Sequence, residues 1–302
     1  MARARIQSTG IELEFDTHGP SGGSPVLLLM GLSGSRLLWP TALIDGLVDH
    51  GHRVIAFDHR DVGGSTVLHD EPVTLDDVRE AFAGWPVTPP YRLEDLARDA
   101  EGLLDHLAVP RAHLIGTSMG GMVGQHLAFT IPDRVLSLTS INSTTGMRVP
   151  ERPLAEPAQI PDPRPPTGWH EFRVWFVDGL RELSSRRWFD EEETAELARA
   201  VWEQGVQPEG NLRHLLAILA DGDRTARLAG VRAPTLVIHG ADDPLIDVGE
   251  GRATAAAVAG SRLVVLEDMA HDLPAALVPR LLEEIAQHLA RASDTSSVSR
   301  PE

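Results

Sequence analysis

The stretch that decides the fold runs from residue 109 to residue 128 and reads VPRAHLIGTSMGGMVGQHLA. An apolar strand leads into Gly116-Thr117-Ser118-Met119-Gly120, and a helical pattern follows. A chain that turns from strand to helix within so few residues strains its backbone at Ser118 and leaves no space for side chains at positions 116 and 120. Glycine at both positions relieves that crowding. The pattern predicts a nucleophilic serine at the turn, with the helix N-terminus aimed at negative charge that develops beside it.

The composition of the chain excludes several classes of partner and of chemistry for such a serine. The chain has 302 residues and a formal charge of −17, so phosphate-rich partners are repelled and nucleic acid is not an expected partner. Cysteine is absent from the sequence, which excludes disulfides, thiolate metal sites and a cysteine nucleophile. We expect no cofactor and no metal. No window approaches the ~18 apolar residues of a membrane span, and no apolar stretch follows Arg3 and Arg5, so a cytoplasmic protein without a membrane partner is expected.

Apolar runs elsewhere indicate further strands, and helical patterns separate them. The expected strands are residues 11–15, 26–30, 53–57, 112–115, 135–141, 235–239 and 263–266, and the expected helices 91–107, 119–130 and 271–290. This alternation predicts an α/β fold with a mainly parallel central sheet covered by helices on both faces. In such sheets the functional groups gather at the carboxyl ends of the strands.

The alternation stops between residues 145 and 228. Residues 150–166 contain seven prolines, which excludes a regular helix or an inner strand there. Amphipathic helical patterns follow at 169–183, 191–204 and 212–220. We therefore expect a core of residues 1–145 and 228–292, an inserted helical cap of residues 146–227, and a polar tail of residues 293–302.

The expected cap is rich in aromatic side chains, most of which should pack the cap against itself. One or two that face the nucleophile would line an apolar pocket for a flat or lipid-like small molecule. Trp175 and Phe176 are the candidates in the cap. Leu32, in the loop after the strand at 26–30, is a third candidate for the pocket wall.

A serine hydroxyl needs an imidazole to take its proton and a carboxylate to orient that imidazole. His271 follows the last apolar strand, on the sheet edge expected to carry Ser118. For the acid, Asp242 and Asp243 compete after the preceding strand. Asp243 is favoured because Pro244 holds it extended, whereas Asp242 suits a turn or a helix cap. Asp247 is a plausible helix cap and a weaker third candidate.

Two backbone N–H groups are needed to bind the oxyanion of an acyl-transfer reaction. One should come from Met119, directly after the nucleophile, and the other from Leu32 in the loop Met30-Gly31-Leu32-Ser33-Gly34. The charged loop at residues 58–66 is interpreted as scaffold, with its ions paired to each other, and not as a metal site.

The motifs Met30-Gly-Leu, Asp58-His-Arg-Asp-Val-Gly-Gly-Ser65, Gly116-Thr-Ser-Met-Gly120, Gly240-Ala-Asp-Asp-Pro244 and Met269-Ala-His271 resemble the α/β-hydrolase superfamily in order and spacing, over about residues 11–290. Within it the chain resembles the esterases related to aclacinomycin methylesterase, which remove the methyl ester of an anthracycline carboxylate. Trp39-Pro40 and His271-Asp-Leu-Pro274 contribute to that likeness. Met30, where many relatives have histidine, and Asp61, where many have glycine, are departures that the esterase subgroup shares.

The resemblance implies Ser118 as nucleophile, Asp243 as acid, His271 as base and the amides of Leu32 and Met119 as oxyanion donors. The expected activity is hydrolysis of a carboxylic ester, and the resemblance suggests the methyl ester of a polycyclic polyketide. The expected partner is an apolar or aromatic small-molecule ester. The alternatives are a C–C bond hydrolase, a lactonase or a cofactor-free perhydrolase with the same residues, and a ligand-binding module on the same fold. The oligomeric state is left open by the sequence.

Overall fold

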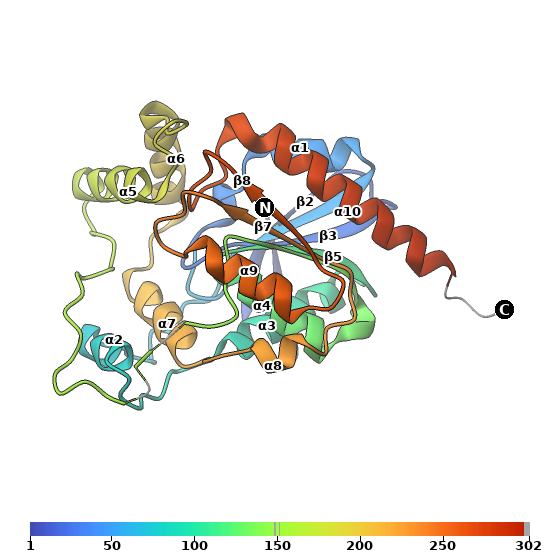
Figure 1. Cartoon of the computed structure of the whole chain (residues 1–302). Helices are drawn as coiled ribbons and strands as arrows, with labels where there is room; N and C mark the ends of the chain where they lie inside the picture. Colours follow the sequence, from blue (N-terminus) through green and yellow to red (C-terminus); the bar gives the residue numbers. More distant parts are fainter. Residues whose placement is uncertain (148, 151, 299–302) are drawn as a thin grey trace.

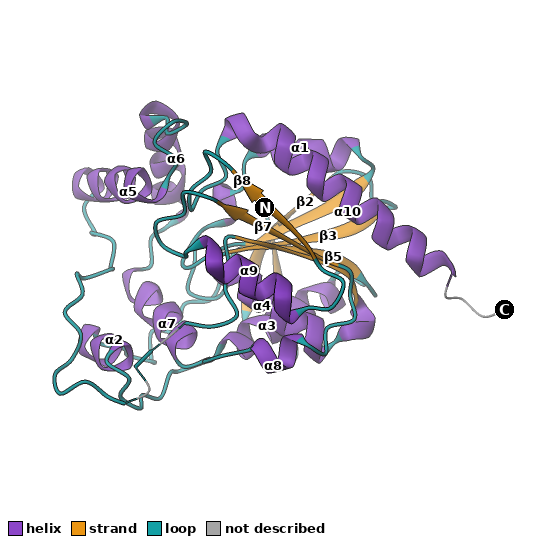
Figure 2. Ribbon diagram, viewed as in Figure 1, coloured by secondary structure: helices purple, strands orange, loops and turns teal. Residues whose placement is uncertain are grey.

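The computed structural model of the chain describes residues 1–147, 149–150 and 152–298. Its centre is an eight-stranded sheet in the order β1-β2-β4-β3-β5-β6-β7-β8, in which β1–β2 and β2–β4 are antiparallel and all other pairs parallel (Figure 2). The strands are β1 (Ala2–Arg5), β2 (Glu12–His18), β3 (Ser24–Leu29), β4 (His52–Phe57), β5 (Ala112–Thr117), β6 (Val135–Ile141), β7 (Thr235–Gly240) and β8 (Arg262–Leu266).

Helices cover both faces of the sheet. The α-helices are α1 (Thr41–Asp49), α2 (Leu75–Phe82), α3 (Leu93–His106), α4 (Met119–Thr130), α5 (Trp169–Leu183), α6 (Glu191–Gln204), α7 (Pro208–Leu219), α8 (Thr225–Leu228), α9 (Val248–Ala257) and α10 (Val278–Val298), and the 3-10 turns are η1 (Arg36–Leu38), η2 (Pro132–Arg134) and η3 (Ala275–Leu277). α1 and α10 lie on one face, and α3, α4 and α9 lie on the other (Figure 1). The predicted α/β architecture is confirmed.

The continuous apolar run of β3 explains how both faces are filled. Successive side chains of a strand point to opposite faces, so an inner strand needs apolar residues at every position. Val26 and Leu28 join the cluster that contains the buried side chains of α1 and α10, whereas Leu27 and Leu29 join the cluster of α3 and α4. The layers place the carboxyl ends of β3, β5, β7 and β8 along one edge.

Several elements differ from the sequence prediction, among them β1 and the last helix. β1 was not expected, because its short run Ala2–Arg5 buries a single side chain, Ala4. The last helix does not begin at residue 271 but at Val278, after the turn η3. Proline lacks the N–H that a helix interior uses, and Pro274 and Pro279 bracket the delayed start, with Pro279 tolerated in the first turn. His271 is therefore on a loop.

The segment between β6 and β7 carries α5, α6, α7 and α8. α5 packs on α6, and α7 packs on α2 (Figure 1). The helix α10 continues to Val298, so residues 293–298 are helical where a polar tail was expected, and residues 299–302 of that tail lie outside the described residues. None of the helices in the described part of the chain is both long and apolar enough to cross a bilayer.

Candidate active site

Ser118 occupies the sharp turn between β5 and α4. Its φ of 53° is a left-handed value that a non-glycine residue rarely adopts, as the sequence predicted for a strained turn. A Cβ on Gly116 would lie 2.3 Å from the carbonyl oxygen of Gly120, and one on Gly120 would lie 1.9 Å from that of Leu29. Only glycine fits at either position, because those contacts are with backbone atoms that have no room to move. The turn thereby raises the serine hydroxyl above the sheet edge.

The three side chains predicted to act together are linked by two hydrogen bonds. Nε2 of His271 lies 3.0 Å from Oγ of Ser118, and Nδ1 of His271 lies 2.7 Å from Oδ2 of Asp243. The second carboxylate oxygen of Asp243 accepts from the amides of Leu245 and Ile246, each at 2.9 Å. With both oxygens engaged and the side chain fully buried, the carboxylate is fixed against the imidazole.

The competing acids are elsewhere. Asp242 is exposed, although its backbone amide donates to the carbonyl of Met269 at 3.0 Å. Asp247 caps α9 by accepting from the amide of Gly249 at 2.7 Å. The structure therefore brings Asp243, and neither neighbour, to His271.

Asn142 is a residue that the sequence analysis passed over. It follows β6, is fully buried, and has a φ of 46°. Its Oδ1 accepts from the amide of Gly240 at 2.9 Å, and its Nδ2 donates to the carbonyl of Ala270 at 2.9 Å. The side chain thus joins the loop that carries Asp243 to the loop that carries His271. Its place directly after a strand, at the edge that carries Ser118, was the signal that could have found it.

The two amides predicted as oxyanion donors belong to the residue after the serine and to a loop that comes close to it. Met119 opens α4, so its N–H has no partner within the helix. The loop with Leu32 comes close to the nucleophile, because a Cβ on Gly31 would lie 3.1 Å from Cβ of Ser118 and 3.7 Å from its Oγ. Neither the Met119 nor the Leu32 amide donates to an acceptor from the described residues. Binding of a developing oxyanion needs two N–H groups that have no acceptor within the protein, and within the described part of the chain these two amides meet that condition.

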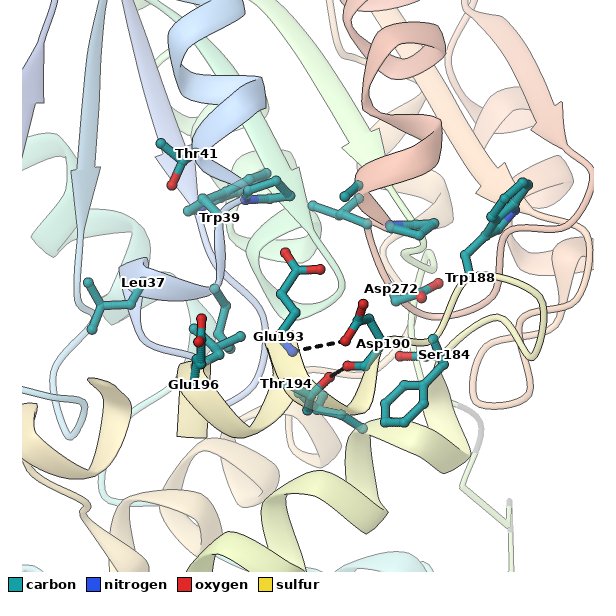
Figure 3. A pocket seen from close by; sticks show the side chains of 18 of the residues that line it. Leu37, Trp39, Thr41, Ser184, Trp188, Asp190, Glu193, Thr194, Glu196 and Asp272 are labelled. Atoms are coloured by element: carbon teal, nitrogen blue, oxygen red, sulfur yellow. Dashed lines mark hydrogen bonds between the residues drawn. The ribbon is translucent and has the colours of Figure 1, made fainter. Parts of the chain in front are cut away.

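A cavity of about 460 Å³ opens beside these groups, between the sheet edge and the α5–α6 pair. Figure 3 shows Trp39, Trp188 and Asp272, from three separate segments, around a common space with the N-terminal part of α6. The wall also includes Thr117, the residue before the serine, and His271, whose ring contacts the serine; Ser118 itself is not among the lining residues. Its remaining side chains are largely apolar, among them Met30, Leu37, Leu38, Leu180, Phe189, Leu197, Leu273 and Pro274.

The ionisable side chains of the cavity wall, apart from His271, are carboxylates. Four carboxylates line it, those of Asp190, Glu193, Glu196 and Asp272, and among the described lining residues there is no lysine or arginine. Burial raises the pKa of Asp272, while the amides of Ser185 and Ala270 donate to it and oppose that rise. A wall of this charge disfavours an anionic ligand.

The cap aromatics chosen from sequence are not in this wall. Trp175 is 37% exposed on the surface of α5, and Phe176 packs with Phe172 between α5 and α6. Trp188 and Phe189, from the connection between those helices, line the cavity instead. Leu32 packs partly buried against the core cluster of α3 and α4. Helical periodicity places side chains on a face but does not say which face meets the sheet edge.

The charged loop at residues 58–66 pairs its ions with other segments and not with each other, which corrects the sequence-based expectation. Asp58 pairs with Arg36, Arg60 with Asp99, and Asp61 with Arg213 of α7. Within the described ranges no group of three or more His, Asp or Glu side chains is placed to hold a metal ion.

The comparison with protein families decides the family. Residues 24–275 match the model of the alpha/beta hydrolase fold, a span that contains all three hydrogen-bonded side chains. The chain belongs to the α/β-hydrolase family. The predicted resemblance and the expectation of a hydrolytic enzyme are thereby confirmed.

Three relatives of this α/β hydrolase are informative. A protein of Variovorax paradoxus (strain S110) named as the carbamate hydrolase RutD is 34% identical over 247 residues, covering 78% of this chain and 79% of that one. The rhodomycin D methylesterase DnrP of Streptomyces peucetius is 29% identical over 322 aligned residues, covering 97% and 100%. The solved structure of a thermophilic esterase from Thermogutta terrifontis has a TM-score of 0.71 at 26% identity and covers 97% and 99%.

Proposed function

We propose that the chain is a serine carboxylic-ester hydrolase that works through an acyl-enzyme. The observation that carries the proposal is the series of contacts from Asp243 through His271 to Ser118, at 2.7 and 3.0 Å. A serine hydroxyl is a weak nucleophile unless a base takes its proton, and a carboxylate beside the far ring nitrogen fixes the tautomer that can do so.

In the proposed mechanism, His271 removes the proton of Ser118 as Oγ attacks the ester carbonyl. The amides of Met119 and Leu32 bind the oxyanion of the tetrahedral intermediate. As the ester C–O bond breaks, His271 returns the proton to the departing alkoxide, which leaves as the alcohol. Water then attacks the acyl-enzyme with His271 again as base, and the acid is released.

For the substrate, we propose the methyl ester of a polycyclic polyketide, a neutral and largely apolar molecule. Similarity to the rhodomycin D methylesterase along 97% of this chain supports that class. The cavity agrees with it, since Trp39, Trp188 and Phe189 offer flat apolar surface. The carboxylates of the wall disfavour esters or lactones that carry a free carboxylate, which separates this proposal from hydrolysis of dicarboxylate-type substrates.

The test is a panel of p-nitrophenyl esters of rising acyl length, an anthracycline-type methyl ester and a matched ester with a free carboxylate. We expect turnover of the neutral esters with methanol released from the polyketide, and the anionic ester as the poorest substrate. Ser118→Ala should lower kcat on the order of 10⁴-fold or more. Hydrolysis of short acyl esters with no action on the polycyclic ester would remove the methylesterase assignment and leave the esterase.

A further inference from the structure

The loop that carries Leu32 is held in a strained turn. The amide of Gly34 donates to the carbonyl of Gly31 at 3.1 Å, so that Leu32 and Ser33 form the corner. Ser33 has a φ of 49°, in the left-handed region that costs a non-glycine residue about 1 kcal/mol or more. Such a conformation persists where surrounding groups hold it in place. The group that does so here comes from a distant helix.

That group is the imidazole of His214 on α7. His214 is fully buried, and its Nδ1 accepts from the backbone amide of Ser33 at 3.1 Å. Its Nε2 lies 3.0 Å from the carbonyl oxygen of Arg60. A backbone amide only donates and a backbone carbonyl only accepts, so a neutral ring with its proton on Nε2 satisfies both partners.

The surroundings of His214 keep the ring neutral and in one orientation. Burial lowers the pKa of His214 to about 4. The carboxylate of Asp61 and the contact with the Arg60 carbonyl oppose this shift, whereas the positive charges of Arg60 and Arg213 add to it. The rings of His59 and Tyr91 stand nearly perpendicular to it, with centroids 6.3 and 6.0 Å away.

The helix that carries the ring is itself anchored to the core. Arg213, the preceding residue, donates to both carboxylate oxygens of Asp61, at 2.8 and 2.7 Å. The hydroxyl of Tyr91 donates to the same carboxylate at 2.7 Å. α7 therefore presents His214 from a fixed position, and Ser33 is held from outside its own turn.

We propose that His214 is a positioning residue for ester hydrolysis: it holds the Ser33 peptide and, through it, the Leu32 amide in the oxyanion hole. The inference rests on the function proposed above. It also gives the segment between β6 and β7 a part in the chemical step, because α7 belongs to that segment while Leu32 belongs to the sheet domain.

The test uses three substitutions in the full chain, with p-nitrophenyl acetate as the substrate. His214→Leu removes both hydrogen bonds. His214→Asn offers an oxygen near the position of Nδ1 and keeps an acceptor for Ser33, whereas His214→Gln reaches the position of Nε2 and keeps the contact with Arg60. Loss of a whole oxyanion donor costs about 10²–10³-fold in kcat, so a displaced one should cost about 10–100-fold.

We expect His214→Leu and His214→Gln to lose kcat by that amount with KM changed less than about twofold, because the contact acts on the transition state. His214→Asn should retain most of kcat. The matched control is His113→Leu on β5, which removes another fully buried histidine, bonded through Nδ1 to Oγ of Ser137 at 2.8 Å near the far end of the strand. The His113→Leu variant should have a lower free energy of unfolding and an unchanged kcat.

Three results would separate the possibilities. A folded His214→Leu variant with the wild-type kcat overturns the positioning role while the esterase stands. Equal losses of kcat in His214→Asn and His214→Gln also overturn the positioning role. If the Leu variant does not fold, the comparison of these two variants is the deciding test. Absence of ester turnover by the wild-type protein would instead refute the proposed function itself.

Discussion

His271 and Asp243 meet at 2.7 Å across 28 residues of sequence, the carboxylate fully buried and the ring only 8% exposed. A contact so sheltered fixes the orientation of the ring, and with it the direction in which Nε2 points to Ser118. The acid and the base stand on separate loops, after β7 and β8. Their alignment therefore depends on how those loops are tied together.

The first prediction concerns the choice between the neighbouring acids. Asp243→Asn should lower kcat by about 10⁴-fold, because an amide facing Nδ1 favours the wrong tautomer of His271. Asp242→Asn is the matched control, with the same chemical change on an exposed neighbour. Steady-state kinetics on one ester would check both variants. A comparable loss in Asp242→Asn would refute the assignment.

The second prediction concerns Asn142. Asn142→Leu leaves the amide of Gly240 and the carbonyl of Ala270 unpaired, which should cost about 1–3 kcal/mol for each group in the free energy of unfolding. Because both loops of the site lose their tie, kcat should fall as well. Urea unfolding and kinetics on the same preparation would measure the two effects. Unchanged kcat in a destabilised variant would show that Asn142 supports the fold and not the alignment.

The third prediction concerns Arg213 and Asp61, an ion pair with side chains 2% and 0% exposed. Breaking a buried pair by removing one partner costs about 3–5 kcal/mol, because the other charge stays buried without compensation. Arg213→Met should therefore destabilise strongly, and Arg213→Met with Asp61→Asn should recover part of the loss. A double-mutant cycle by urea unfolding is the measurement. Additive losses would mean that the pair does not act as a unit.

The fourth prediction concerns acid stability. Burial lowers the pKa of His59 and His113 to about 3 and that of His214 and His288 to about 4. In the unfolded chain a histidine takes a proton near pH 6.5, so the unfolded state binds more protons and stability falls as the pH drops from about 6.5 toward 4.

Each such histidine should contribute up to about 1.4 kcal/mol per pH unit to that slope below pH 6.5. His113→Leu should reduce the slope by one such contribution, because it removes one of the buried neutral imidazoles. Urea unfolding at pH 7, 6 and 5 gives the slopes. An identical slope in His113→Leu would contradict the buried neutral state of that ring.

The features that could be predicted from the sequence are those determined by residues close to one another in the chain. The apolar runs of β3, β5 and β7 need both faces of a sheet covered, and the glycines around Ser118 fit only a tight turn. Asp243 could be separated from Asp242 because Pro244 restricts one of them. Each of these signals lies within a few residues of the feature it predicts.

The rest depends on contacts between distant segments. Arg213 meets Asp61 across 152 residues, and His214 meets Ser33 across 181, so no local pattern reveals either pair. Asn142 has no carboxylate, and its role appears only when two loops are seen on either side of it. Likewise, the periodicity of α5 does not predict that Trp188 and Phe189, in the connection after it, line the cavity.

The most direct test of the account is covalent labelling with a fluorophosphonate probe, followed by intact mass and peptide mapping. The account predicts one rapid adduct on Ser118, greatly slowed in His271→Ala and Asp243→Asn and absent in Ser118→Ala. Failure of the folded wild-type protein to react, or an adduct on another residue while ester turnover continues, would contradict it.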